Sequence, residues 1–114
     1  MHVPIQITSR GKSVETRALI DCGAGGKFID QEFVRQHHLP TRRLFKPIRA
    51  LNVDGTPNKN GIIRTYTLLP VKVHGRTCTH RLYICGLGQQ TIILGMPWLR
   101  ETNPIIDWKR GTLE

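Results

Sequence analysis

Asp21 is the residue of this chain whose setting best suits it for chemistry. Two apolar residues, 19–20, lead up to it, and three small residues, 22–24, follow it. The apolar approach predicts a buried strand, and the small residues predict that the chain turns as soon as that strand ends. We therefore expect the Asp21 carboxylate to stand on a rigid loop. For an isolated Asp-Cys-Gly, the alternative is an Asp that turns an exposed hairpin.

A second segment, near the other end of the chain, complements the first. It reads Ile92-Ile93-Leu94-Gly95 and is followed by Pro97-Trp98-Leu99. Together the two segments resemble the two halves of a retroviral-type (retropepsin-like) aspartic protease domain, most closely that of a gypsy-type LTR retrotransposon Gag-Pol polyprotein. The resemblance covers roughly residues 5–108. It implies an all-β chain with the retropepsin-like acid protease fold: a closed β-barrel-like half-lobe, a flap hairpin and one or two short helices.

The length of the chain determines how such a site would be completed. A chain of 114 residues suits one domain, 1–114, with one core. Pepsin-like enzymes carry two catalytic Asp loops in one longer chain, whereas this chain has a single such loop. The second Asp21 would therefore come from a second copy in a C2 homodimer.

Two Asp21 carboxylates would form the catalytic dyad. At a separation of about 3 Å they cannot both ionise, so they share one proton. The ionised carboxylate takes a proton from water as the water attacks the scissile carbonyl, and the protonated one polarises that carbonyl and later protonates the leaving amine. The resemblance thus implies an aspartic endopeptidase that cleaves its own retrotransposon polyprotein.

The active-site loop, Cys22, Gly23 and Ala24, both follows and departs from the family pattern. Without a Cβ, Gly23 permits a positive φ and lets its backbone amide face the carboxylate. Ala24 is small enough to leave the substrate channel open. Cys22 stands where the family has Ser or Thr, whose hydroxyl bonds across the dimer axis, and a thiol is a weaker donor and acceptor. Cys22 therefore predicts a looser dyad or a weaker dimer than Ser would give. The alternative function is a catalytically weak or inactive module for dimerisation or peptide binding.

The substrate would be held between this loop and two other segments. Residues 51–58 resemble the family's flap, in which an Asp-Gly pair is a strong hairpin signal. Such a hairpin closes over an extended peptide and excludes water. The expected flap residues are Val53, Asp54, Gly55 and Thr56; the expected pocket walls are Ala24, Val53 and Ile92; the expected second loop under the dyad is Ile93, Leu94 and Gly95.

Turn signals divide the rest of the chain into short strands. Asp30 is the expected N-cap of a helix over 31–38, and Pro97 is expected in the first turn of a helix over 96–101. As in the family, the last strand is expected to join the dimer interface, and Trp98 and Trp108 to be core or dimer anchors. The expected strands are 3–8, 14–20, 28–29, 48–53, 61–69, 71–73, 77–84 and 105–108.

The charge of the chain raises the question of a polyanionic partner. Lysine and arginine total 17 against 8 acidic residues, a formal net charge of +9. The basic residues are scattered, without a long basic run or an aromatic stacking platform beside them. Direct nucleic-acid binding is therefore not expected, and a solvated basic surface is the simpler interpretation. The expected partners are a second copy of the chain and a polyprotein or peptide substrate.

The three cysteines, Cys22, Cys78 and Cys85, are an odd number without the spacing of a disulfide framework. Cys78, His80 and Cys85 lack the partner pair of a zinc site, so no metal and no cofactor are expected. No apolar run approaches about 18 residues, so no membrane partner is expected. With the resemblance, these features predict a soluble protein of a reducing, intracellular compartment: the cytoplasm, within retrotransposon particles.

Overall fold

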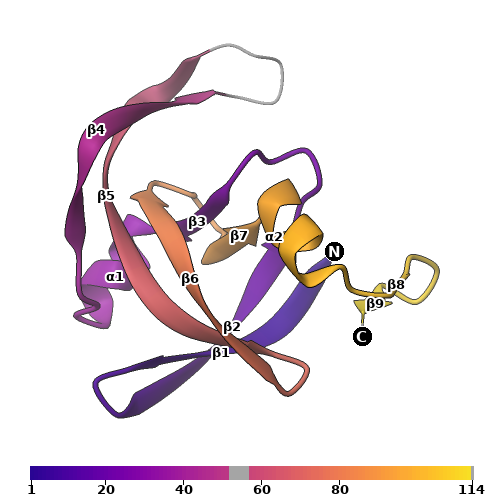
Figure 1. The fold of residues 1–114 in the computed structure, drawn as a ribbon. Helices are drawn as coiled ribbons and strands as arrows, with labels where there is room; N and C mark the ends of the chain where they lie inside the picture. Colours follow the sequence, from indigo (N-terminus) through magenta and orange to yellow (C-terminus); the bar gives the residue numbers. More distant parts are fainter. Residues whose placement is uncertain (52–56, 114) are drawn as a thin grey trace.

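The computed structural model describes residues 1–51 and 57–113, which form strands and two short helices (Figure 1). The all-β class expected from the sequence is confirmed. In this part of the chain neither helix has the length and apolarity that crossing a membrane requires. The elements are β1 (His2–Ser9), β2 (Lys12–Ile20), β3 (Lys27–Asp30), α1 (Gln31–Gln36), β4 (Arg42–Leu51), β5 (Pro57–Val73), β6 (Arg76–Cys85), β7 (Ile92–Leu94), α2 (Met96–Thr102), β8 (Ile106–Asp107) and β9 (Thr112–Leu113).

Six strands close into a barrel. Their order is β1-β2-β7-β3-β6-β5, and the barrel closes because β1 pairs again with β5 through Gln6 with Lys72 and Ile7 with Val71. β4 pairs with the outer part of β5 and is an edge strand of the sheet. The strand that leads to Asp21, β2, runs parallel to β7, so the two segments singled out in the sequence lie side by side.

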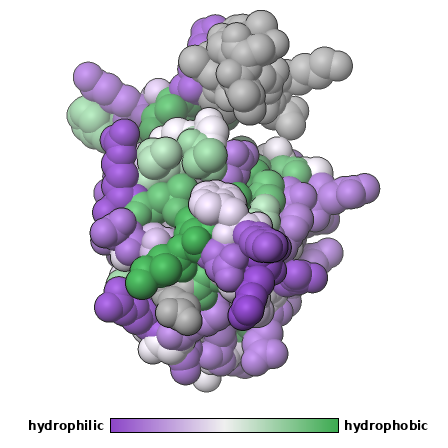
Figure 2. Space-filling model, turned by 90° about the vertical axis from the view of Figure 1, so that its right-hand side faces the viewer, coloured by the Kyte–Doolittle hydropathy of each residue, from purple (hydrophilic) through white to green (hydrophobic). Residues whose placement is uncertain are grey.

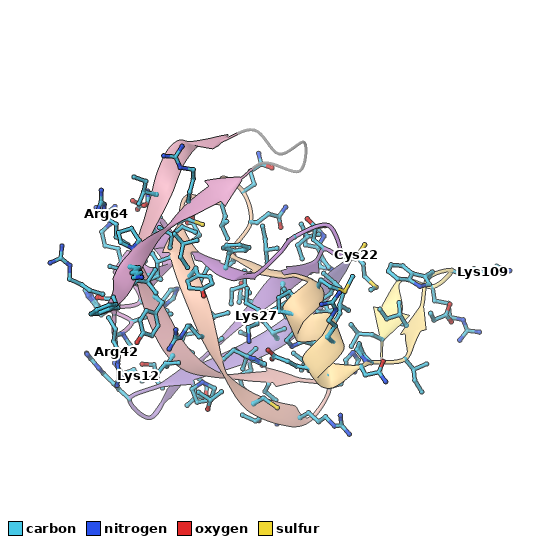
Figure 3. All side chains as sticks on the ribbon, turned by 45° about the horizontal axis from the view of Figure 1, so that its top comes forward. Lys12, Cys22, Lys27, Arg42, Arg64 and Lys109 are labelled. Atoms are coloured by element: carbon cyan, nitrogen blue, oxygen red, sulfur yellow. The ribbon has the colours of Figure 1, made fainter. Side chains whose placement is uncertain are left out.

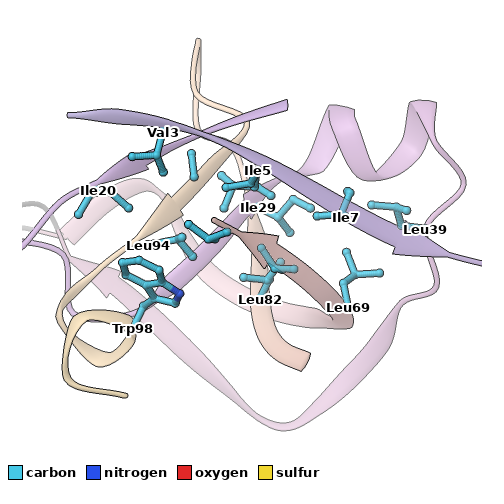
Figure 4. Close-up of a cluster of buried hydrophobic side chains, with 14 of the residues drawn as sticks. Val3, Ile5, Ile7, Ile20, Ile29, Leu39, Leu69, Leu82, Leu94 and Trp98 are labelled. Carbon is cyan, nitrogen blue, oxygen red and sulfur yellow. The ribbon is translucent and has the colours of Figure 1, made fainter. Parts of the chain in front are cut away.

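The barrel is filled by the inward residues of each strand (Figure 4). On β1, Val3, Ile5 and Ile7 are buried while their neighbours are more exposed, which is the period of two expected of a half-buried strand. Trp98 of α2 is 2% exposed and belongs to the same cluster, so its prediction as a core residue is confirmed. Burial of a side chain this large contributes about 3–5 kcal/mol to folding.

Several predicted boundaries were wrong for reasons that tertiary contacts explain. β5 is one strand through Pro70, not two, because β6 pairs with it continuously from Tyr66 to Val73. α1 ends at Gln36, since His38 adopts a left-handed φ of 50°. Asp30 does occupy the N-cap, but its side chain makes no capping bond. Its Oδ1 instead accepts the Leu87 N–H at 2.9 Å.

The last strand is shorter than predicted and pairs within its own chain. β8 and β9 form a separate hairpin, and Leu113 of β9 is buried against the barrel core. Ile105 and Trp108 are 73% and 68% exposed, so Trp108 is not a core residue of the single chain. Figure 2 shows apolar side chains gathered on the face that carries α2 and this hairpin.

Candidate active site

The Asp21 loop is held by backbone hydrogen bonds on both sides of the carboxylate. The Asp21 N–H donates to the Leu94 carbonyl at 3.1 Å, which continues the pairing of β2 with β7. The Ala24 N–H donates back to the Asp21 carbonyl at 3.0 Å and closes a tight turn. The Gly23 N–H donates to Asp21 Oδ1 at 3.0 Å. The carboxylate therefore stands on a defined loop, with one oxygen already oriented by an amide.

Gly23 faces the carboxylate with its amide, as expected. It does so without the positive φ that a glycine permits. The space around it explains the small residue instead, because a Cβ at this position would lie 3.3 Å from Asp21 Oδ1. A larger residue would thus press on the carboxylate itself.

The segment that follows β7 locks the other side of the loop. The Gly95 N–H donates to the Gly26 carbonyl and the Met96 N–H to the Ala24 carbonyl, each at 2.9 Å. A Cβ on Gly95 would lie 2.3 Å from the Ala24 oxygen and 2.5 Å from the Gly26 oxygen, closer than real Cβ atoms approach. Only glycine fits this crossing. The structure thus brings together residues 21–26 with Leu94 and Gly95.

A cluster of Lys27, His80 and Glu101, in which only His80 is buried, anchors the end of the loop. Lys27, which follows the loop directly, donates to both Glu101 carboxylate oxygens at 3.2 and 3.1 Å and lies 3.3 Å from His80 Nδ1. Figure 3 shows Lys27 beside α2. Burial and the Lys27 ammonium lower the pKa of His80, and the Glu101 carboxylate opposes them. The neutral imidazole therefore accepts a hydrogen bond from the Lys27 ammonium and ties β3 to β6, while the Lys27–Glu101 ion pair ties β3 to α2.

The prediction that Ile92 lines the substrate pocket is wrong. It is fully buried in the core, because β7 alternates and turns Ile92 and Leu94 inward. Ile93 lies on the other face and is half-buried. Of the other predicted wall residues, Ala24 lies in the loop and is half-buried. The predicted flap residues Val53, Asp54, Gly55 and Thr56 lie outside the described residues.

A row of half-buried apolar side chains begins beside the candidate catalytic residue. Ile93 pairs with Leu19, two positions before Asp21, and on its other side with Phe28. Phe28 in turn pairs with Tyr83, and the two ring centroids are 6.1 Å apart. The sequence did not predict this row because it depends on the register of three strands. Such a row suits the side chains of an extended peptide.

The row continues onto β5 and ends in a cation–π contact. Tyr66 pairs with Tyr83, and the Arg81 guanidinium lies 4.4 Å from the centre of the Tyr66 ring. The end of the row that carries the charged Arg81 guanidinium therefore lies away from the Asp21 loop.

The described residues show no arrangement typical of a reactive cysteine or of a metal site. Cys22 and Cys78 are exposed (Figure 3 shows Cys22), while His80 is buried against Lys27. Burial, with the Asp30 carboxylate, raises the pKa of the Cys85 thiol to about 11. Within residues 1–51 and 57–113, no three His, Cys, Asp or Glu side chains are grouped so that they would hold a metal ion.

Comparison with known proteins agrees with this geometry. The family model of the PEG10/RTL1 protease domain matches residues 17–114. The structure is similar to the retroviral protease-like domain of Ddi1 from Leishmania major, with a TM-score of 0.63 and 18% identity over 99% of this chain and 84% of that one. It is also similar to EIAV protease in complex with the inhibitor HBY-793, with a TM-score of 0.66 and 14% identity over 94% of this chain and 91% of that one. The retroviral protease-like fold expected from the sequence is thus confirmed.

Proposed function

Because the chain belongs to the PEG10/RTL1 protease domain family, we propose that it is an aspartic endopeptidase that works as a C2 homodimer. The observation that carries the proposal is the Asp21 loop. Its carboxylate accepts the Gly23 N–H at 3.0 Å, and three hydrogen bonds tie its backbone to the β7–α2 segment. This rigidity suits a catalytic group whose position decides the rate.

The homodimer supplies the second carboxylate. Across the two-fold axis the two Asp21 side chains share one proton. The ionised one takes a proton from the attacking water, and the protonated one donates to the carbonyl oxygen of the scissile bond. In each copy the Gly23 amide holds one carboxylate oxygen, so the other is free to point toward water or substrate. Ile105 and Trp108, exposed on the face of α2 and the hairpin, are the apolar surface proposed to be covered by the partner.

The substrate is an extended peptide, for which the row of Ile93, Phe28 and Tyr83 provides an apolar surface next to Asp21. We propose that it belongs to the polyprotein of a gypsy-type LTR retrotransposon, of which this domain is itself a part. Val53–Thr56 are proposed as the flap that covers it.

One feature favours a second candidate function. Cys22 replaces the family's hydroxyl residue next to the catalytic Asp, which weakens the contact between the two loops. A domain with this change and without turnover would act as a dimerisation or peptide-binding module.

The experiment that separates the two functions is peptide cleavage in a complex peptide mixture, read by mass spectrometry at mildly acidic pH with reductant. Its variants are Asp21→Asn and, as the matched control, Glu15→Gln, which removes an exposed carboxylate from β2, the strand that leads to Asp21. The enzyme loses all cleavage in Asp21→Asn and keeps it in Glu15→Gln. Sedimentation in the same buffer reports the dimer. A dimer that cleaves nothing would refute the protease and support the binding module.

A further inference from the structure

β4 combines three features that the proposed protease activity does not use. It lies at the edge of the sheet, it is basic and it exposes an aromatic ring. Its four basic side chains are all exposed, and the sequence has no Asp or Glu between Glu32 and Asp54. Glu32 itself pairs with Arg35 on α1. The four cations are Arg42, Arg43, Lys46 and Arg49.

Phe45 lies in the middle of these cations and is 97% exposed. A ring exposed to this degree contributes almost nothing to the core of its own chain. Ile48, three positions further along β4, is 37% exposed. An aromatic face among cations is the arrangement on which a nucleobase stacks while its phosphates are neutralised.

The basic surface continues beyond β4. A pocket of about 450 Å³ lies between the β1–β2 turn and the end of α1, with an apolar floor and a rim of Arg10, Lys12, His37 and His38. Among the described residues, no Asp or Glu lines it. In Figure 3, Lys12, Arg42 and Arg64 lie on one side of the molecule, and Lys109 of the C-terminal hairpin lies on the opposite side. Some of the basic residues that are scattered in the sequence, among them Lys12, Arg42 and Arg64, therefore lie on one side of the fold.

We propose that this surface, β4 together with the pocket of Arg10, Lys12, His37 and His38, binds single-stranded nucleic acid. Cations along β4 contact the phosphates, and Phe45 stacks on an unpaired base. An added peptide strand is the other occupant that a sheet edge attracts. Here Pro47 removes an N–H from the edge, and the register shifts between Arg43 and Ile48, both of which disfavour strand addition.

The test is fluorescence anisotropy with a labelled single strand of about 20 nucleotides of mixed sequence, titrated from about 50 to about 200 mM salt. Each phosphate contact contributes about 0.7 to the slope of log K against log salt, so Arg42→Ala/Arg43→Ala should lower the slope by about 1.4. Phe45→Ala should weaken binding about tenfold, and Phe45→Trp should restore it.

The matched control is Lys72→Ala/Arg76→Ala, which removes the same charge from exposed positions of the β5–β6 hairpin. It should leave both affinity and slope close to the wild type. Equal losses in the two double variants would overturn the proposal, because net charge alone would then explain the binding. Tighter binding of polyglutamate, or of a duplex of the same sequence, would overturn it as well. Circular dichroism of each variant verifies the fold.

Discussion

Replacing Gly95 by Ala tests the close backbone crossing that fixes the Asp21 loop. The added Cβ would lie 2.3 and 2.5 Å from the carbonyl oxygens of Ala24 and Gly26, both backbone atoms that no rotamer change can move. The β7–α2 segment must retreat by about 1 Å to reach ordinary contact. The bonds from the Gly95 and Met96 amides, each 2.9 Å long, are then lost.

The cost follows from these two effects. Overpacking of this kind costs about 1–3 kcal/mol, and each lost hydrogen bond about 1 kcal/mol. The lower conformational freedom of unfolded Ala returns about 0.4–1 kcal/mol. The net destabilisation is about 3 kcal/mol, a large share of the stability of a domain of this size. The melting temperature should fall by about 12 °C.

The assay is urea and thermal unfolding at one fixed protein concentration, since self-association would otherwise alter the apparent stability. Gly25→Ala is the matched control. It lies in the same loop, its φ is not left-handed and a Cβ there meets nothing within 4 Å. We expect it to stay within about 0.5 kcal/mol of the wild type. If Gly95→Ala were as stable as Gly25→Ala, the close approach of the loop to β7 would be refuted.

Three further predictions concern other parts of the molecule. The pKa of His80 is lowered in the folded state. Its contribution to folding stability is therefore complete above the unfolded pKa of about 6.5 and is lost as pH falls through the folded pKa. Melting temperatures measured from mildly acidic to neutral pH should rise with pH for this reason, and His80→Asn should remove that rise. Cys85, with a pKa of about 11, should react with iodoacetamide at pH 8 through a thiolate fraction of about one in a thousand, far more slowly than exposed Cys22, as mass spectrometry would show. Trp98→Ala should lower the free energy of unfolding in urea by about 3–5 kcal/mol. Trp108→Ala should lower that of the single chain by less than about 0.5 kcal/mol, and sedimentation should show that it weakens the proposed dimer.

Each of these has a result that contradicts it. An unchanged acid slope in His80→Asn would mean that burial does not lower the pKa of His80 in the folded state. Equal alkylation of Cys22 and Cys85 would show that the Cys85 thiol is open to solvent. Self-association unchanged in Trp108→Ala would exclude its ring from the interface.

Local patterns predicted the Asp21 loop well because its determinants are local. Apolar residues before a carboxylate and small residues after it describe a strand that ends in a tight turn. The late Ile-Leu-Gly segment was also recognisable, since a glycine after a buried strand marks a close backbone approach. What could not be predicted depends on register: only pairing shows that Ile93, not Ile92, faces outward, and that Phe28 and Tyr83 are its neighbours.

Long-range contacts also explain the other misses. Lys27, His80 and Glu101 come from three separate elements, and no spacing in the sequence links them. Phe45 lies outside the strands expected from the sequence, and only the fold places it on β4, an edge strand. Pro70 marks a turn in the sequence, but the pairing with β6 overrides it.

The parallel pairing of β2 with β7 also dictates when the Asp21 loop can form. Leu19 has to meet Ile93, so the contact that supports Asp21 closes a loop spanning most of the domain. Such non-local pairing is slow and comes late in folding. On the ribosome, Asp21 emerges long before Leu94 and Gly95. Until these two residues follow, the backbone hydrogen bonds that hold the Asp21 loop cannot form. The order of synthesis therefore keeps the carboxylate unassembled until almost the whole domain has been made.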